Sequence, residues 1–212
     1  MLKVKVFTFS PIQENTYVLY NEDKKAIIID PGCYFPAEQD QLLQFIQTNE
    51  LEVVKLLNTH CHLDHVFGNK WVYDTFKTPL HIHPDEEAML KMAPLSGEKW
   101  GLPFENYQGP LQFLYPGDTV LLGNDALKVI FAPGHSPASI CFYSESQAFL
   151  IGGDVLFRES IGRTDLPGGN HALLLQSIRR NLFILPDEVK VYPGHGLTTT
   201  IGYEKRNNPF LQ

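Results

Sequence analysis

The sequence predicts an α/β chain, in the broad sense that includes α+β, in which two β-sheets pack together and helices lie outside them. Strand-like segments come in two runs, within residues 2–30 and 119–151, and helix-like segments follow each run. Neither a fixed-period repeat nor a low-complexity linker divides the chain, so we expect a single domain over residues 1–212. Two central sheets with outer helices are the simplest layering for this order of elements.

The first half of the chain is predicted to begin with three neighbouring strands. Residues 2–9 alternate apolar and polar side chains, and residues 15–20 and 25–30 follow as strands around a polar turn at 21–24. The unbroken run Ala26-Ile27-Ile28-Ile29 is typical of a strand buried on both faces. Further along we expect a helix from Pro36 to Glu50, a strand at 53–57, a helix at 66–76, a strand at 79–83 and a helix at 84–92.

The second half is predicted to hold another run of strands after a long connection. Residues 93–118 are rich in Pro and Gly with aromatic side chains between them, and a loop of this length is often functional. We expect it either to wall a substrate site or to form an ordered surface crossing. After it we expect strands at 119–122, 127–131, 139–143 and 148–151, a helix capped by Asn170 with Leu174, Ile178 and Leu182 at every fourth position, a strand at 189–192 and a short helix or turn at 202–208.

Composition and charge limit the class of protein. Lys and Arg number 17 against 24 Asp and Glu, a formal charge of −7, whereas a nucleic-acid surface normally has a basic face. No stretch approaches the ~18 consecutive apolar residues of a membrane span, and the N-terminus has no apolar signal core. Cys33, Cys61 and Cys141 are too scattered for a disulfide framework. We therefore expect a soluble cytoplasmic protein without nucleic-acid or membrane partners, and the oligomeric state stays open.

A cluster of metal-ligand side chains follows the strand at 53–57. His60, His62, Asp64 and His65 fall within six positions. Side chains alternate in an extended segment, so His60, His62 and Asp64 are expected to point one way and His65 to follow where the chain turns. Imidazole and carboxylate are ligands of zinc and related metals, usually four to a site. This segment is therefore predicted to hold a metal at the end of a strand.

Three more such side chains each follow a predicted strand. His135, Asp154 and His195 lie in turns that contain Gly, which lets the backbone approach closely. Because strand ends of one sheet open on a common edge, these residues can converge on residues 60–65. Seven ligands are too many for one zinc and nearly right for two. Two metals ~3.5–4 Å apart can share a hydroxide, and a bound water with a pKa of roughly 7 is a nucleophile at neutral pH, so the set indicates a hydrolytic site.

The residues from Thr59 to His65 resemble the H-x-H-x-D-H signature of the metallo-β-lactamase superfamily. The remaining ligands of that superfamily correspond, in order, to Pro133-Gly134-His135, Gly153-Asp154 and Pro193-Gly194-His195. Within it the chain is most similar to the glyoxalase II (hydroxyacylglutathione hydrolase) branch, especially its compact single-domain bacterial members. Two stretches carry this finer resemblance: Asp154-Val155-Leu156-Phe157 and Ile161-Gly162-Arg163-Thr164-Asp165-Leu166-Pro167-Gly168-Gly169. The match covers essentially the whole chain.

The resemblance implies both a fold and a division of the ligands. The fold is a four-layer αββα sandwich of two mixed β-sheets flanked by helices. The implied cofactors are two divalent metal ions, expected to be zinc with iron or manganese as alternatives. The implied ligands are His60, His62 and His135 for one ion and Asp64, His65 and His195 for the other, with Asp154 as the bridge. Asp64 and Asp154 are expected to be the catalytic residues.

The activity that the resemblance implies is hydrolysis of a thioester, such as a hydroxyacylglutathione or a related acyl thiol, by attack of a metal-bridging hydroxide. A small-molecule thioester is therefore the expected partner. Glyoxalase II continues past its last ligand with a helical domain that helps to bind glutathione. Only the short segment 196–212 follows His195, so that C-terminal domain is expected to be absent.

Three other interpretations stay open. The Gly162–Asp165 stretch also resembles the persulfide dioxygenases of the same fold, which would bind a single iron through His60, His135 and Asp154. A metal-binding protein without catalysis is a remoter alternative, because seven ligands exceed what a structural zinc site uses. A β-lactam hydrolase is disfavoured by the lack of an export signal and by the same Gly162–Asp165 stretch.

Several other polar residues carry two interpretations. Arg163 is either a substrate contact, as a basic residue near this place is in glyoxalase II, or one half of a buried pair with Asp165. Asp30 either orients a ligand histidine or only forms the turn after a strand. Cys61 is expected to be a small buried apolar side chain. Ordinary polar positions are expected for His81, His83 and His171.

Overall fold

The first of two six-stranded sheets is built from the N-terminal half of the chain. The computed structural model describes residues 1–212, and the strands of this sheet lie in chain order. They are β1 (Lys3–Phe9), β2 (Glu14–Tyr20), β3 (Lys25–Ile29), β4 (Glu52–Leu57), β5 (Leu80–Ile82) and β6 (Leu111–Phe113). Strands β1 to β3 are antiparallel neighbours and β3 to β6 run parallel, so the sheet is mixed. The carboxyl end of β4 leads directly into residues 58–65.

The second sheet comes from the C-terminal half and is also mixed. Its strands, in spatial order, are β14 (Thr199–Thr200), β13 (Lys190–Pro193), β10 (Phe149–Gly153), β9 (Ile140–Ser144), β8 (Asp125–Phe131) and β7 (Thr119–Leu122). Strands β7 to β10 form an antiparallel meander, whereas β13 lies parallel to β10. Strands β8, β10 and β13 therefore run the same way, and the segments after them lie at one edge. A short hairpin of β11 (Leu156–Phe157) and β12 (Ser160–Ile161) follows β10.

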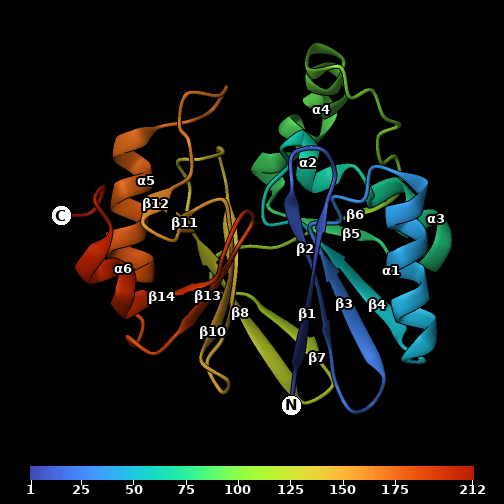
Figure 1. The fold of residues 1–212 in the computed structure, drawn as a ribbon, viewed down its shortest axis with the longest axis horizontal. Coiled ribbons are helices and arrows are strands. Elements are labelled where there is room, and N and C mark those ends of the chain that lie inside the picture. Colours follow the sequence, from blue (N-terminus) through green and yellow to red (C-terminus); the bar gives the residue numbers. More distant parts are fainter.

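Helices cover the outer faces of both sheets, as Figure 1 shows. They are α1 (Pro36–Thr48), α2 (Leu63–Val66), α3 (Asn69–Phe76), α4 (Glu87–Trp100), α5 (His171–Ser177) and α6 (Ile201–Asn207), with a 3₁₀ turn at Pro84–Glu86 and a π-helical turn at Ile178–Leu182. Helices α1 and α3 lie outside the first sheet, and α5 and α6 lie outside the second. The predicted αββα sandwich is confirmed. None of the helices has the length and apolar character needed to cross a bilayer.

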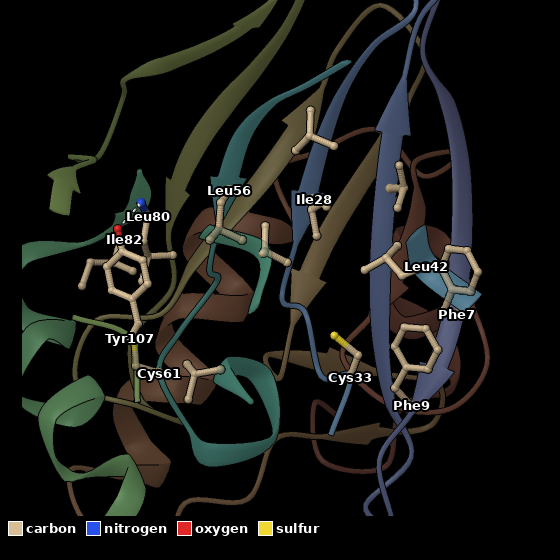
Figure 2. Close-up of a cluster of buried hydrophobic side chains, with 14 of the residues drawn as sticks. Phe7, Phe9, Ile28, Cys33, Leu42, Leu56, Cys61, Leu80, Ile82 and Tyr107 are labelled. Atoms are coloured by element: carbon tan, nitrogen blue, oxygen red, sulfur yellow. Dashed lines mark hydrogen bonds between the residues drawn. The ribbon is translucent and has the colours of Figure 1, made fainter. Parts of the chain in front are cut away.

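Three apolar layers hold the four structural layers together. Strand β3 is buried on both faces, as predicted, because its side chains alternate between two of these layers. Ile28 packs with Leu42 of α1 in the layer beneath the outer helices, which Figure 2 shows. Ile27 faces the other way and packs with Phe142 between the two sheets. The third layer lies between the second sheet and α5, where Leu174 is fully buried.

The helix predicted at 66–76 is in fact two helices. Helix α2 begins at Leu63, and α3 begins only after Gly68. The backbone of Gly68 passes so close to the segment after β3 that a Cβ there would lie 2.4 Å from Cys33 Sγ and 2.7 Å from the Pro31 carbonyl oxygen. The Gly68 N–H also donates to that carbonyl at 2.7 Å. Because the Gly68 N–H bonds to Pro31 and not to a carbonyl one turn earlier, the helix is interrupted between α2 and α3.

The helix predicted at 84–92 is longer than expected, and the loop predicted at 93–118 is shorter. Helix α4 continues through Pro94 to Trp100, and β6 occupies part of the remaining loop. A proline inside a helix costs ~3 kcal/mol, which is the reason to expect a break there. Leu90, Ala93 and Gly97 are buried along one face of α4, and their packing outweighs that cost.

Candidate metal centre

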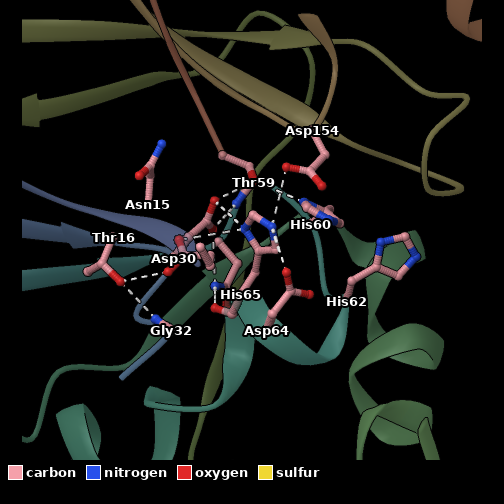
Figure 3. Close-up of polar contacts among 12 residues, drawn as sticks. Asn15, Thr16, Asp30, Gly32, Thr59, His60, His62, Asp64, His65 and Asp154 are labelled. Carbon is pink, nitrogen blue, oxygen red and sulfur yellow. Dashed lines mark hydrogen bonds and ion pairs between the residues drawn. The ribbon is translucent and has the colours of Figure 1, made fainter. Parts of the chain in front are cut away.

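Five parts of the chain bring seven His and Asp side chains to the edge where the two sheets meet. Their sources are the loop after β4 (His60 and His62), α2 (Asp64 and His65), the segment after β8 (His135), the end of β10 (Asp154) and the end of β13 (His195). Figure 3 shows Asp154 approaching the histidines of the first sheet from the opposite side. All seven predicted site residues therefore lie together.

The predicted alternation of side chains stops at His62. The backbone of His62 is extended, with φ −67° and ψ 155°, but α2 begins at the next residue. Asp64 and His65 are therefore neighbours on a helical turn, and the expectation that Asp64 shares a face with His60 and His62 by strand alternation was wrong. A helix of four residues is too short to show a helical period in the sequence.

Three imidazoles form one set of ligand atoms, named here the three-histidine group: His60, His62 and His135. His62 Nδ1 lies 2.8 Å from His135 Nε2, and His60 Nε2 lies 3.2 Å from the same atom. Two nitrogens bound to one zinc at ~2.0–2.1 Å with tetrahedral angles lie roughly 3.3 Å apart. The group is thus spaced as three ligands of one ion would be.

Asp64, His65 and His195 form the second set, named here the acidic group. Asp64 Oδ2 lies 3.0 Å from His195 Nε2 and 3.7 Å from His65 Nε2. Asp154 lies between the two groups, because its Oδ1 is 3.4 Å from His65 Nε2 and its Oδ2 is 3.5 Å from His135 Nε2. A carboxylate in this position can serve an ion on each side.

Backbone carbonyl groups fix which ring nitrogen faces the centre. His135 Nδ1 donates to the carbonyl of Arg163 at 2.7 Å, and His195 Nδ1 donates to the carbonyl of Gln13 at 3.1 Å. Because a carbonyl oxygen only accepts hydrogen bonds, each of these nitrogens must carry a proton. A neutral ring with its proton on Nδ1 leaves Nε2 free for a metal.

Asp30 orients histidines of both groups, as Figure 3 shows. It accepts hydrogen bonds from the backbone N–H of Thr59 at 2.7 Å and from the Thr59 hydroxyl at 2.6 Å. Its Oδ2 also lies 3.1 Å from His65 Nδ1, and the Thr59 oxygen lies 3.1 Å from His60 Nδ1. These contacts support the interpretation that Asp30 orients a ligand histidine.

Glu14, on β2, is a second buried carboxylate behind the acidic group. One of its oxygens accepts from the Thr16 hydroxyl at 2.8 Å, and the other lies 3.9 Å from His65 Nδ1 without a hydrogen bond. Burial raises the pKa of Glu14 well above its ordinary value, and the charge of His65 opposes this shift only in part. Glu14 was not predicted as a site residue, because the sequence of a strand does not show which helix will pack against that strand.

The two groups differ in charge. Burial and the neighbouring imidazoles lower the pKa of His60, and they lower the pKa of His62 to about 3. Burial acts in the same direction on His65 and His195, but the carboxylates around them outweigh it and raise both pKa values. The surroundings of the three-histidine group therefore favour neutral imidazoles, whereas the carboxylates of the acidic group favour protons on the imidazoles beside them.

Two buried polar atoms at the centre, His65 Nε2 and Asp154 Oδ1, have no hydrogen-bond partner. An unpaired buried polar atom costs ~1–3 kcal/mol, so a concentration of such atoms at one point needs a cause. A bound cation would satisfy nitrogen and carboxylate donors of this kind. The residues present therefore fit a centre for divalent metal ions.

A cavity of about 300 Å³ opens on both groups. Its other walls are mainly apolar and are formed by Ile12, Leu63, Trp100, Phe157, Ser160, Ile161, Arg163 and Leu166. Trp100 belongs to the region that was expected either to wall a substrate site or to cross the surface. Its place at the cavity agrees with the first of these two expectations.

Arg163 contacts the centre through its backbone and borders the cavity with its side chain. The guanidinium forms a two-point ion pair with Asp165, at 2.7 Å from Nε and 2.8 Å from Nη2. The side chains of the pair are 51% and 69% exposed. The expected pair therefore exists, but the expectation that it is buried was wrong. A pair in this exposed position leaves the guanidinium accessible from the cavity.

The remaining histidines and Cys61 lie outside the centre. His81 Nδ1 is 3.1 Å from the carbonyl oxygen of Leu56, and His83 Nδ1 accepts from the backbone N–H of Asp85 at 3.2 Å. His171 is exposed at the start of α5. Cys61 is fully buried in the apolar layer that Figure 2 shows. These positions agree with the predicted ones.

The family model described as the metallo-beta-lactamase superfamily matches residues 10–195. Two relatives are similar over nearly their whole length. A Bacillus subtilis protein named "Probable metallo-hydrolase YqgX" is 37% identical over 211 residues, which are 99% of this chain and 98% of that protein. The "Hydroxyacylglutathione hydrolase GloC" of Haemophilus influenzae is 34% identical over 212 residues, again 99% and 98% of the two chains.

Two solved structures share the fold. The BLEG-1 B3 metallo-beta-lactamase is 39% identical with a TM-score of 0.91, over 99% of this chain and 100% of that one. TTHA1623, solved in a di-iron-bound form, is 38% identical with a TM-score of 0.89, over 98% and 100%. The family match, the relatives and the common architecture agree with the His and Asp cluster described above. The chain belongs to the metallo-beta-lactamase superfamily and is a metal-dependent hydrolase of that superfamily.

Proposed function

We propose that this protein is a dinuclear hydrolase of a thioester, similar to glyoxalase II. The three-histidine group would hold one divalent ion, the acidic group would hold the other, and Asp154 would bind both. The observation that carries the proposal is the position of Asp154, whose two oxygens border the two groups at 3.4 and 3.5 Å. Ions bound there would supply a water with a lowered pKa and a positive charge beside the substrate carbonyl.

The chain's own carboxylates and imidazoles prepare the centre for this reaction. Burial would raise the pKa values of Asp64 and Asp154, but the charge of His65 is the main influence that outweighs it and lowers both. Both side chains are therefore ionised at neutral pH and can accept a proton from a water at the centre. Asp30 keeps the ring of His65 in place while that proton moves.

The cavity supports an acyl thioester as the substrate class. Its apolar walls suit an acyl chain or the carbon skeleton of a thiol, and Arg163 offers a positive charge to a carboxylate at the rim. The similarity to a protein named hydroxyacylglutathione hydrolase also supports a thioester. Zinc, iron and manganese are all candidate metals, since a relative with 38% identity was solved with two irons.

The proposal is tested by thiol release from a panel of acyl thioesters, with protein loaded with zinc, iron or manganese in turn. A hydroxyacylglutathione and thioesters of simpler thiols are the first substrates. We expect thiol release that depends on the metal and disappears in the metal-free protein. Absence of thiol release with every metal and every acyl group would contradict the proposal.

A β-lactam is the second candidate substrate, because a chain described as a B3 metallo-beta-lactamase is 39% identical to this one. Its strained amide presents a carbonyl group to the same centre. Loss of β-lactam absorbance without any thioester hydrolysis would favour this function. A persulfide dioxygenase with one iron at His60, His135 and Asp154 predicts a different outcome, namely oxygen consumption with a persulfide and no hydrolysis.

A further inference from the structure

Glu86 is a buried carboxylate that has no part in the chemistry proposed above. It ends the 3₁₀ turn that precedes α4, and its side chain is fully buried. All of its hydrogen-bond donors are uncharged groups, and it does not border the cavity. Burying a carboxylate is unfavourable, and burial indeed raises the pKa of Glu86, although its hydrogen bonds oppose this shift. A carboxylate kept in such a place needs an explanation.

The two oxygens of Glu86 join the two loops that carry the three-histidine group. Oε2 accepts from the backbone N–H of Cys61 at 2.9 Å, and Cys61 separates two histidines of the group. Oε1 accepts from the Ser136 hydroxyl at 2.7 Å and from the backbone N–H of Ala138 at 2.8 Å. Ser136 directly follows the third histidine of the group. One side chain therefore connects all three ligand positions.

Little else ties these loops together near the imidazoles. The backbone N–H of Ile140 donates to the carbonyl of Thr59 at 2.9 Å, which joins the loops at the start of β9. Apart from this bond and the contacts among the imidazoles themselves, the Glu86 carboxylate makes the connection. Hydrogen bonds to a charged acceptor are roughly twice as strong as neutral ones, so three of them on one carboxylate form a stiff link.

We propose that Glu86 is a positioning residue for the three-histidine group, which holds the two loops in register before an ion binds. The inference rests on the proposed metal centre and adds a residue outside it. Groups that orient metal ligands from behind typically change metal affinity by roughly 10–100-fold when they are replaced. Glu86 does not contact the histidines themselves. It acts through hydrogen bonds to residues next to them in the chain, including the backbone N–H groups of Cys61 and Ala138.

The test compares Glu86→Gln with a matched variant, Glu204→Gln. Glu204, on α6, is equally buried and also accepts three hydrogen bonds, from the Glu159 N–H, the Thr199 hydroxyl and the Asn208 amide. It contacts none of the seven site residues. Gln keeps the size of the side chain but replaces one acceptor oxygen with a donor. At position 86 that donor faces a backbone N–H in either orientation of the amide, whereas at position 204 it can donate to the Thr199 hydroxyl. Glu86→Gln is therefore expected to lower the unfolding temperature by more than Glu204→Gln.

The deciding readouts are taken on the whole chain without any assay of turnover. Metal-free protein is titrated with Co²⁺ against a competing chelator, which gives a dissociation constant for each ion. Glu86→Gln is expected to raise the dissociation constant of the ion at the three-histidine group by roughly 10–100-fold and to leave that of the other ion unchanged. The amides of Cys61 and Ala138 are expected to exchange faster in metal-free Glu86→Gln. Glu204→Gln is expected to change neither readout.

The identity of the weakened site comes from combined variants. The effect of Glu86→Gln should persist when His195→Ala removes a ligand of the acidic group, and should vanish when His135→Ala disrupts the three-histidine group. Folded Glu86→Gln protein that binds both ions as tightly as wild type would overturn the inference. Equal weakening by Glu204→Gln would also overturn it, because the effect would then be a general loss of stability.

Ser136→Ala keeps the inference testable if Glu86→Gln does not fold. It removes one donor to the Glu86 carboxylate and should raise the dissociation constant of the ion at the three-histidine group by roughly three- to tenfold. An unchanged affinity in that variant would overturn the inference. The proposed function fails in a different way, since wild-type protein would then bind fewer than two ions or release no thiol from any thioester, whereas failure of the Glu86 inference leaves both properties of the wild type intact.

Discussion

The three-histidine group and the acidic group meet at Asp154, but they are built on opposite principles. The three-histidine group consists of imidazoles whose pKa values burial lowers, and the groups that hold it are a hydroxyl, a backbone carbonyl and the remote carboxylate of Glu86. The acidic group consists of ion pairs between imidazole and carboxylate, with Asp30 and Glu14 behind His65.

This difference indicates how each group is prepared for a cation. The imidazoles of the three-histidine group already have free lone pairs, so an ion displaces no proton from them. In the acidic group, the carboxylates raise the affinity of His65 and His195 for protons, and an ion competes with those protons. Substitutions and pH should therefore affect the two groups differently.

Removal of Asp64 should abolish function through the acidic group alone. In Asp64→Ala we expect one ion to be lost and turnover to fall by roughly a thousandfold, because a metal supplies several kcal/mol of transition-state stabilisation. Metal content and thioester hydrolysis are measured on the same sample. Asp74→Ala, on the exposed side of α3, is the matched control and should resemble wild type. Full activity in Asp64→Ala would contradict the two-ion scheme.

Asp30→Asn should weaken the acidic group more than the three-histidine group. The carboxylate of Asp30 accepts two hydrogen bonds from Thr59 and places a negative charge beside His65 Nδ1. An amide has only one acceptor oxygen and no charge, so it cannot do both. We expect the ion of the acidic group to bind roughly 10–100-fold more weakly, as replacements behind a ligand histidine usually show. Separate dissociation constants for the two ions measure this effect. Equal weakening of both ions would contradict the expected difference between the groups.

The two groups should respond differently to pH. Carboxylates raise the pKa values of His65 and His195, so these rings hold their protons to a higher pH than free imidazole and lose them as pH rises through the raised pKa. Affinity of the acidic group for metal should therefore increase with pH, by about tenfold per pH unit for each proton released. His60 and His62 have lowered pKa values, so the other ion should show little dependence above about pH 6. Calorimetric titration in buffers of different ionisation enthalpy counts the protons.

Arg163→Ala should give the smallest effect, because the side chain is half exposed and already paired with Asp165. We expect KM for a thioester that carries a carboxylate to rise roughly threefold at low salt, with kcat and metal content unchanged. A thioester without a carboxylate is the control substrate and should show no change. A large fall in kcat would instead show that the backbone at 163, which holds His135, has moved.

Much of the fold and of the candidate site follows from local sequence patterns. The unbroken apolar run in β3 indicates a strand with helices on one face and a second sheet on the other, and the structure confirms this. Each of the seven site residues follows closely on a predicted strand, so the convergence at one edge could be expected from strand ends alone. The division into two groups came from resemblance to a family and not from spacing.

The features that sequence reasoning missed depend on contacts between distant segments. Glu14 and Glu86 are single acidic residues. Glu14 lies behind the acidic group only because α2 packs on β2. Glu86 reaches the loops of the three-histidine group only because the 3₁₀ turn before α4 packs against them. Helix α4 continues through Pro94 because Leu90, Ala93 and Gly97 are packed in the interior, which helix propensities of single residues do not describe. The interruption between α2 and α3 at Gly68 likewise depends on Cys33 and Pro31, more than thirty residues away.

Metal content per chain is the most direct test of two groups that share Asp154. Freshly purified wild-type protein and Asp64→Ala are analysed for zinc, iron and manganese alongside protein concentration. Two ions per chain in the wild type and one in Asp64→Ala are expected. A single ion per chain in the wild type, unchanged in Asp64→Ala, would contradict the division into two metal-binding groups and would favour the mononuclear iron alternative.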